Sequence, residues 1–99
     1  MASSKEYLEF VSDLLSGIEG IRTRPMMGEY LIYYNDKVVG GIYDDRFLLK
    51  PTDGVKKLLG DQTLEIPYDG AKPMILIDTE DRELLESVIK AAYEDILRK

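Results

Sequence analysis

Hydrophobic positions near both ends of the chain recur with the 3.6-residue period of an α-helix. The first stripe predicts a helix over residues 3–18 and consists of Tyr7, Leu8, Val11, Leu14, Leu15 and Ile18. Ser3 followed by Glu6 predicts a capping box at its start. The second stripe predicts a helix that Asp78 or Thr79 caps and that runs to about Leu97; it consists of Leu84, Leu85, Val88, Ile89, Ala92 and Ile96. Two amphipathic helices of this kind are expected to bury their hydrophobic stripes against a common core.

Between the helices the hydrophobic pattern changes to a period of two, which is typical of β-strands. Strands are predicted over residues 21–26, 30–34, 37–43 and 46–50. Asn35-Asp36 and Asp44-Asp45 separate the last three strands at the spacing of tight hairpins. Pro25 has no backbone donor, so the first strand is expected at a sheet edge.

Two further details of these strands are predicted. Gly40 and Gly41 indicate a bulge or a close approach of another backbone. In the fourth strand Phe47 and Leu49 face one way and Leu48 the other, which suits a sheet with one face on the core and one partly in water.

The second half of the chain adds a short helix and two short strands. The helix ends at Leu59 before Gly60 and is capped by Thr52 or Asp53. The strands are expected over residues 64–67 and 74–77, with a turn over 68–71 between them. The element order α-β-β-β-β-α-β-β-α predicts a single α+β domain over residues 1–99, with an antiparallel sheet and the helices on one face.

Composition narrows the functional classes. The net charge is −6, from 13 basic and 19 acidic residues, so a nucleic-acid footprint is not favoured. Residues 21–57 are nevertheless weakly basic, which fits either an acidic partner or strand edges kept soluble by charge. Cysteine is absent, which excludes disulfides and thiolate metal sites. With no signal-like or membrane-spanning apolar run, a cytoplasmic location is expected.

The chain resembles the N-terminal domain of TfoX, also called Sxy, a bacterial competence regulator. The resemblance rests on Arg24-x-Met26-Met27-Gly28 with Tyr30, Ile32 and Tyr33, on Asp36, Ile42, Asp45-Arg46 and Leu49-Lys50, and on Tyr68 with Gly70-x-Lys72-Pro73. The order of elements agrees over residues 6–97. The family is similar in fold to YjbR-like and secretion-chaperone-like α+β domains, which implies the same architecture here.

The sequence departs from the family pattern at particular positions. Met27 stands where phenylalanine is common, Glu29 where a second glycine is common, and Gly41 where an aliphatic residue is usual. Full competence regulators also carry a second, helical domain that this sequence lacks. The resemblance therefore implies a stand-alone regulatory domain and does not transfer a role in transcription.

Catalytic chemistry is weakly supported. Histidine, the commonest general base, is absent. Ser87 and Lys90 have a Ser/Lys nucleophile spacing but lie within a surface helix without the usual context. Asp44-Asp45 fits turn chemistry better than a cation site, and Asp78, Glu80 and Asp81 are helix-start signals rather than a calcium loop. We therefore expect no catalytic residues, no metal, no cofactor and no enzyme activity.

The favoured function is a non-enzymatic regulatory or adaptor domain that acts by protein contact, including self-association. Tyrosine and arginine are common at interface hot spots. The expected contact residues are Arg24, Met27, Tyr30, Arg46, Lys50 and Lys72. The alternative is a module that binds a small ligand or nucleic acid on the sheet, because Arg24, Tyr30, Tyr33, Tyr34, Arg46 and Lys50 interleave aromatic and basic side chains.

Overall fold

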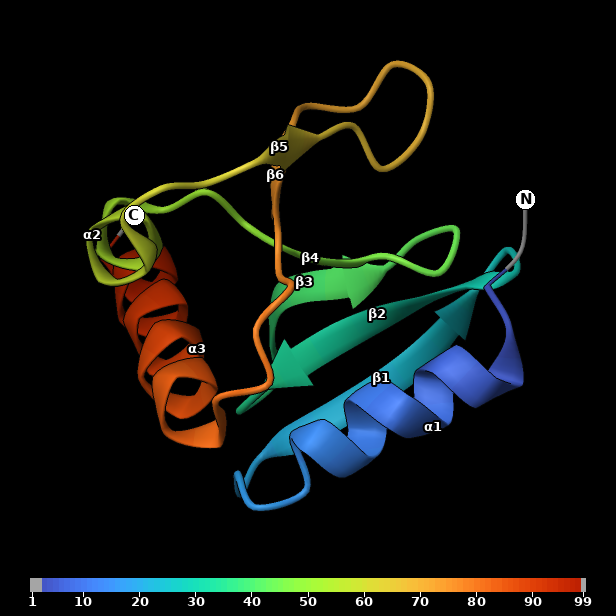
Figure 1. The fold of residues 1–99 in the computed structure, drawn as a ribbon, viewed down its shortest axis with the longest axis horizontal. Coiled ribbons are helices and arrows are strands. Elements are labelled where there is room, and N and C mark those ends of the chain that lie inside the picture. Colours follow the sequence, from blue (N-terminus) through green and yellow to red (C-terminus); the bar gives the residue numbers. More distant parts are fainter. Residues whose placement is uncertain (1–2, 99) are drawn as a thin grey trace.

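The computed structural model describes residues 3–98, which form one α+β unit with the predicted order of elements (Figure 1). Within these residues the helices are α1 (Lys5–Leu14), α2 (Asp53–Leu59) and α3 (Arg82–Leu97). The strands are β1 (Ile21–Met26), β2 (Glu29–Tyr34), β3 (Lys37–Ile42), β4 (Phe47–Leu49), β5 (Leu64–Glu65) and β6 (Met74–Leu76). The elements are slightly shorter than predicted at several ends, where strand pairing or helical bonding stops before the hydrophobic pattern does.

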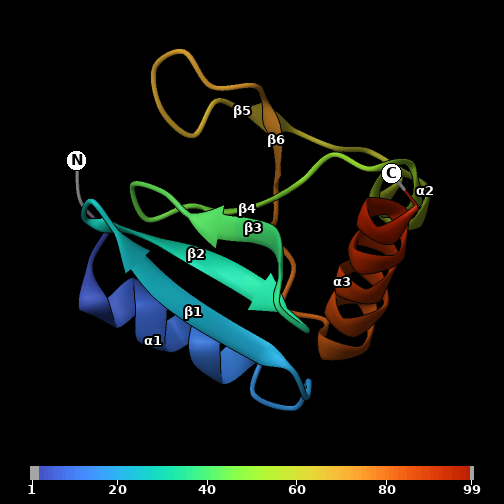
Figure 2. The same ribbon diagram turned by 180° about the vertical axis from the view of Figure 1, so that it is seen from behind.

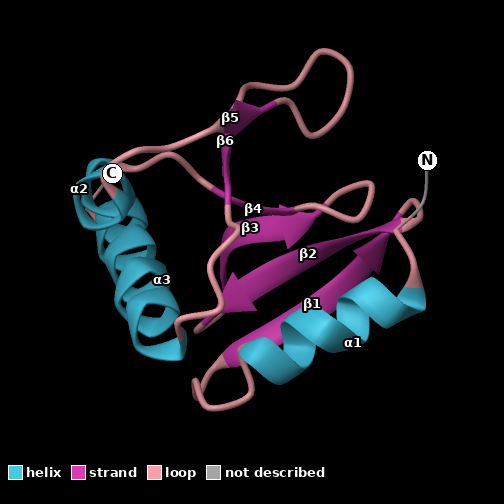
Figure 3. Ribbon diagram, viewed as in Figure 1, coloured by secondary structure: helices cyan, strands magenta, loops and turns pink. Residues whose placement is uncertain are grey.

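The strands form a single antiparallel sheet in the order β1-β2-β3-β4-β6-β5 (Figure 3). β1 lies at one edge, as Pro25 predicted, and the two-residue β5 lies at the other. The first four strands are neighbours in sequence and in space. β6 returns beside β4, and β5 is therefore placed outside it.

Tight turns of two residues connect the first four strands. Asn35 and Asp36 have positive φ angles of 48° and 70°, and Asp44 and Asp45 have 52° and 56°. Positive φ at both central positions is the geometry of a type I′ hairpin, which asparagine and aspartate tolerate better than most residues. The predicted hairpins are confirmed.

The hydrophobic core lies between the helices and one face of the sheet. It unites Val11 and Leu14 of α1 with Val88 and Ile89 of α3 in one cluster. α1 runs along β1, whereas α3 lies beside α2 and packs on β2 and β3 (Figure 1 and Figure 2). The helices therefore share a core, as predicted. They do not pack side by side; the end of α1 meets the start of α3 where Arg82 bonds Asp13 at 3.3 Å.

Both long helices begin one or more residues later than predicted. Ser4, not Ser3, caps α1, with its hydroxyl accepting from the Tyr7 N–H at 3.1 Å. Asp81, not Asp78 or Thr79, caps α3 by accepting from the Leu84 N–H at 3.1 Å. The sequence offers several short polar residues at each start. The Ser3 hydroxyl is already bonded to Glu29 and Asp45, which leaves Ser4 to cap α1, and the connection from β6 sets where α3 begins.

Gly40 and Gly41 occupy crowded positions in β3, next to the expected irregularity. The β2–β3 register shifts between Ile32 and Tyr33, which leaves Val39 as an extra residue and confirms the bulge. A Cβ on Gly40 would collide with the Leu48 carbonyl oxygen. A Cβ on Gly41 would lie 2.7 Å from the Tyr43 ring and 2.8 Å from the Tyr30 carbonyl oxygen, so packing favours glycine at this position.

β4 differs from its prediction because both of its faces are buried. Phe47 and Leu49 belong to the core cluster, as expected. Leu48 points the other way but is also fully buried, together with Tyr43. The Tyr43 ring contacts Tyr68 of the β5–β6 loop, with ring centroids 6.0 Å apart. The β5–β6 loop covers this part of the sheet, so the face of β4 that the alternating pattern predicted to be in contact with water is buried.

A polar network joins the N-terminal segment to two hairpins through Glu29. Its carboxylate accepts from the Ser3 N–H, the Ser3 hydroxyl and the Asp44 N–H, each at 2.9 Å. The Ser3 hydroxyl also accepts from the Asp45 N–H at 3.1 Å, and the Asp45 carboxylate accepts from the Ser4 N–H at 2.7 Å. Glu29, a departure from the family pattern, thus fastens the start of α1 to the sheet.

Replacing Glu29 with alanine is expected to lower the free energy of unfolding by about 1–2 kcal/mol, because several charge-assisted hydrogen bonds are lost together. Urea unfolding measures this loss. The control is Glu9→Ala on the exposed face of α1, which should change stability by no more than about 0.5 kcal/mol. Equal effects of the two substitutions would show that the network contributes nothing beyond surface charge.

Candidate functional site

The face of the sheet opposite the helices, which we call the open face, gathers the basic residues of β1. Ile32 faces the core, so Leu31 and Tyr33 face the other way. Directly paired residues of antiparallel strands share a face. Arg24 pairs with Leu31 and Arg22 with Tyr33. Both arginines are exposed and therefore stand on the open face above half-buried Leu31 and Tyr33.

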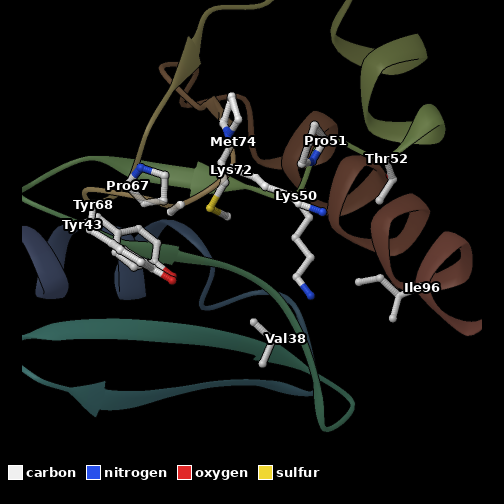
Figure 4. Close-up of a pocket in the computed structure, with 12 residues that line it drawn as sticks. Val38, Tyr43, Lys50, Pro51, Thr52, Pro67, Tyr68, Lys72, Met74 and Ile96 are labelled. Carbon is white, nitrogen blue, oxygen red and sulfur yellow. The ribbon is translucent and has the colours of Figure 1, made fainter.

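The same face carries a cleft of about 620 Å³ over β3 and β4 (Figure 4). Val38 of β3 and Met74 of β6 line it from the sheet. Pro67, Tyr68 and Lys72 line it from the β5–β6 loop, and Thr52 and Ile96 from the start of α2 and the end of α3. The lining is mainly apolar. It draws on segments far apart in sequence, so only the fold brings them together.

Arg46 fastens the loop that walls the cleft. Its guanidinium forms an ion pair with Glu65 at 2.7 Å and donates to the carbonyls of Ile66 and Pro67 at 3.3 and 3.4 Å. Its Nε also donates to the Tyr43 carbonyl at 3.1 Å. A planar guanidinium can satisfy several acceptors in fixed directions, which suits this bracing role. Arg46 is therefore tied into the fold rather than presented to solvent.

Two lysines supply the charge of the cleft. The Lys50 side chain extends across it toward Val38 and Ile96 (Figure 4), and Lys72 lines it from the loop. Within residues 3–98 neither ammonium has a carboxylate at ion-pair distance. No aspartate or glutamate is among the described residues that line the cleft. A protein of net charge −6 therefore contains a locally cationic hollow.

Tyr43 and Tyr68 form the aromatic end of the cleft. Burial raises the pKa of the Tyr43 hydroxyl, and the nearby Tyr68 and Glu29 act in the same direction. Because an ordinary tyrosine already titrates near 10, Tyr43 stays neutral at physiological pH. The Tyr43 ring thus adds apolar surface without adding negative charge.

The predicted contact residues occupy different places. Lys50 and Lys72 both line the cleft, while Arg24 lies on the open face three strands away, about 14 Å from β4 at ordinary strand spacing. Met27 is 97% exposed at the β1–β2 turn. Tyr30 packs against the core. Their role as contact residues stays a prediction, but they do not form one continuous surface.

The aromatic and basic residues that suggested nucleic-acid binding are divided between the two faces. Tyr34 is buried against the helices, where its ring meets Tyr93 edge-on at 5.2 Å. Tyr30 also packs on the core side, and Arg46 is engaged by the loop. Of the aromatic members of that set, Tyr33 alone is left on the open face within the described residues. Stacking of successive bases needs several exposed rings, and this arrangement does not provide them.

The weaker sequence motifs have structural roles. Lys90 forms an ion pair with Glu86 at 3.0 Å, and the hydrogen bond and charge of Glu86 raise the pKa of Lys90. A general base requires the opposite shift. Among residues 3–98 we find no cluster of three or more potential metal ligands, and none of their helices has the length and apolar character needed to span a bilayer.

Sequence reasoning missed most of the cleft. Tyr43, Met74 and Ile96 were read only as strand or helix residues. Pro51, Pro67 and Pro73 all line the cleft and were available as a signal, because prolines at the ends of strands often mark rigid loops. Their convergence depends on β6 returning beside β4, which no local pattern encodes.

Comparison with known proteins identifies a family and a relative. The chain is 35% identical to an uncharacterised 12.7 kDa protein from the trpE 5′ region of Spirochaeta aurantia, over an alignment that covers 99% of this chain and 80% of the relative. The family model of the TfoX N-terminal domain matches residues 13–96, from the end of α1 to the last turn of α3. Membership of this family suggests a regulatory domain. The chain belongs to the TfoX N-terminal domain family.

Proposed function

We propose that this domain is a non-enzymatic regulatory or adaptor module that binds an acidic segment of a partner protein on the open face of its sheet. The observation that carries the proposal is the arrangement of β1 and β2. Arg22 and Arg24 stand side by side on the open face, with Leu31 and Tyr33 beside them. Cationic groups next to partly exposed apolar groups are suited to a partner that has acidic and apolar side chains.

Two physical features support this use. Arg22 and Arg24 form no ion pair within the described residues, so a partner's carboxylates would not need to displace internal ones. Pro25 lacks a backbone donor at the sheet edge, which discourages indiscriminate strand addition and leaves recognition to side chains. Arginine and tyrosine are also the residues most enriched at binding hot spots.

Reversing both charges, with Arg22→Glu and Arg24→Glu together, is expected to weaken binding to the partner. The partner is identified by affinity capture from the host lysate and then purified, and its affinity is measured at several salt concentrations. Association with the wild-type protein should slow as salt rises, because exposed charges are screened over about 10 Å at 0.1 M. The variant should show weaker binding and a flatter salt dependence.

The matched control reverses Lys56 and Lys57 on α2, which are exposed and carry the same total charge. Both double variants change the net charge equally, so a general repulsion from an acidic partner would weaken the binding of both to the same extent. If the β1 variant remains folded and binds the purified partner like wild type at every salt concentration, the proposal is wrong. Sedimentation of the protein alone measures its oligomeric state and so distinguishes self-association from binding to a different protein.

A further inference from the structure

We infer that the cleft over β3 and β4 is a binding site for a small amphipathic anion, with a carboxylate or similar group held by Lys50 and Lys72 and an apolar body between the sheet and the β5–β6 loop. This goes beyond protein contact through β1. It assigns a second, separate site to the opposite half of the open face.

The first argument is electrostatic. Lys50 is half-buried, yet it has no carboxylate partner within residues 3–98. A charge that is partly shielded from water attracts an opposite charge more strongly than a fully exposed one does. Lys72 lines the same cleft and also has no carboxylate partner in the described part of the chain. Together they offer a positive site that an anion would neutralise, and no lining acid among the described residues would repel it.

The second argument is shape. Small-molecule sites usually have volumes of about 300–1,000 Å³ and mainly apolar walls with a few polar groups. The cleft has a volume of about 620 Å³, and Val38, Met74 and Ile96 provide apolar contacts beside Lys50. Tyr43 and Tyr68 provide ring surface at one end (Figure 4). The ligand therefore has a charged head and an aromatic or aliphatic body, unlike a free phosphate.

The third argument is pre-organisation. The loop wall is braced by the Arg46–Glu65 ion pair and by the Arg46 hydrogen bonds to Ile66 and Pro67. Prolines restrict the backbone at both sides of the cleft. A wall that is already ordered does not cost conformational entropy when a ligand binds. Arg24, in contrast, is exposed and does not line this cleft.

Paired fluorescent probes test the inference. Anilinonaphthalene sulfonate carries an anionic group, and N-phenylnaphthylamine has nearly the same ring system without it. The wild-type protein is expected to bind the sulfonate more tightly than the neutral dye. Octanoate should displace the bound sulfonate, whereas octanol at the same concentration should not.

Substitutions locate the site. Lys50→Met, which keeps an unbranched side chain of similar length and removes the charge, should weaken sulfonate binding by about tenfold, the effect of one charge-assisted contact. Its affinity for the neutral dye should stay within about twofold of wild type. Lys72→Met should also weaken sulfonate binding, and Lys50→Arg should preserve it. Lys57→Met on α2 is the control and should leave the affinity for both dyes unchanged.

Backbone-amide NMR should place the octanoate-induced shifts at Val38, Lys50 and Met74. Lys72 is exposed, so its variant is expected to fold even if the Lys50 variant does not. Equal binding of both dyes, unchanged sulfonate affinity in Lys72→Met, or shifts centred on another exposed apolar side chain such as Phe10 would overturn the inference. Because these measurements use no protein partner, they are independent of the Arg22 and Arg24 experiment.

Discussion

Replacing Ile89 with alanine is expected to lower the free energy of unfolding by about 2–5 kcal/mol, the usual cost of removing a large side chain from a packed core. Ile89 is completely buried in α3 and belongs to the cluster that joins both long helices to the sheet. A domain of this kind has only about 5–15 kcal/mol of total stability, so the loss is a large fraction. Leu14→Ala, on the α1 side of the same cluster, should fall in the same range.

Urea unfolding, followed by circular dichroism, measures both losses. Leu97→Ala is the matched control in α3, because Leu97 is 52% exposed and should lose less than about 1 kcal/mol. If Ile89→Ala and Leu14→Ala both cost less than about 1 kcal/mol, the two helices cannot share the core described here.

The second large effect is expected at Gly40, where alanine should cost about 1–3 kcal/mol through overpacking. The added methyl group would collide with the Leu48 carbonyl oxygen and lie 2.8 Å from the Leu49 side chain. β4 is paired on both sides, by β3 and by β6, and its residues are buried on both faces. The strand therefore has little room to move away, and the strain stays in the native state.

Gly17→Ala is the control for this prediction. Nothing lies within 4 Å of a Cβ at Gly17, and its backbone is not in the left-handed region. Alanine there should leave stability unchanged or raise it slightly, because it restricts the unfolded chain. Thermal unfolding of the two variants compares them directly. Similar melting temperatures would mean that the sheet adapts to the methyl group and that Gly40 is not required by packing.

Local patterns predicted what local physics controls. The two helical stripes identified the residues that face the core, and Asn35-Asp36 and Asp44-Asp45 identified hairpins because few residues tolerate positive φ. Exact ends were less predictable. Ser3 and Asp78 are good cap residues by type, but Ser4 and Asp81 are the caps. The Ser3 hydroxyl is engaged by Glu29 and Asp45, and the connection from β6 delays the start of α3.

The candidate sites show the same division. The sequence by itself indicated Arg24, Lys50 and Lys72 as candidate contact residues, a role that stays a prediction, and it determined the α+β fold from the spacing of apolar residues. Only the tertiary structure decided that Lys50 and Lys72 share a walled cleft, that Arg24 lies apart from them, and that Arg46 braces a loop. The physical reason is that strand order and face depend on pairing between distant segments. β6 pairs with β4 through Leu48 with Leu76 and Leu49 with Ile75. Because these residues are far apart in the sequence, a short window of sequence cannot predict the pairing.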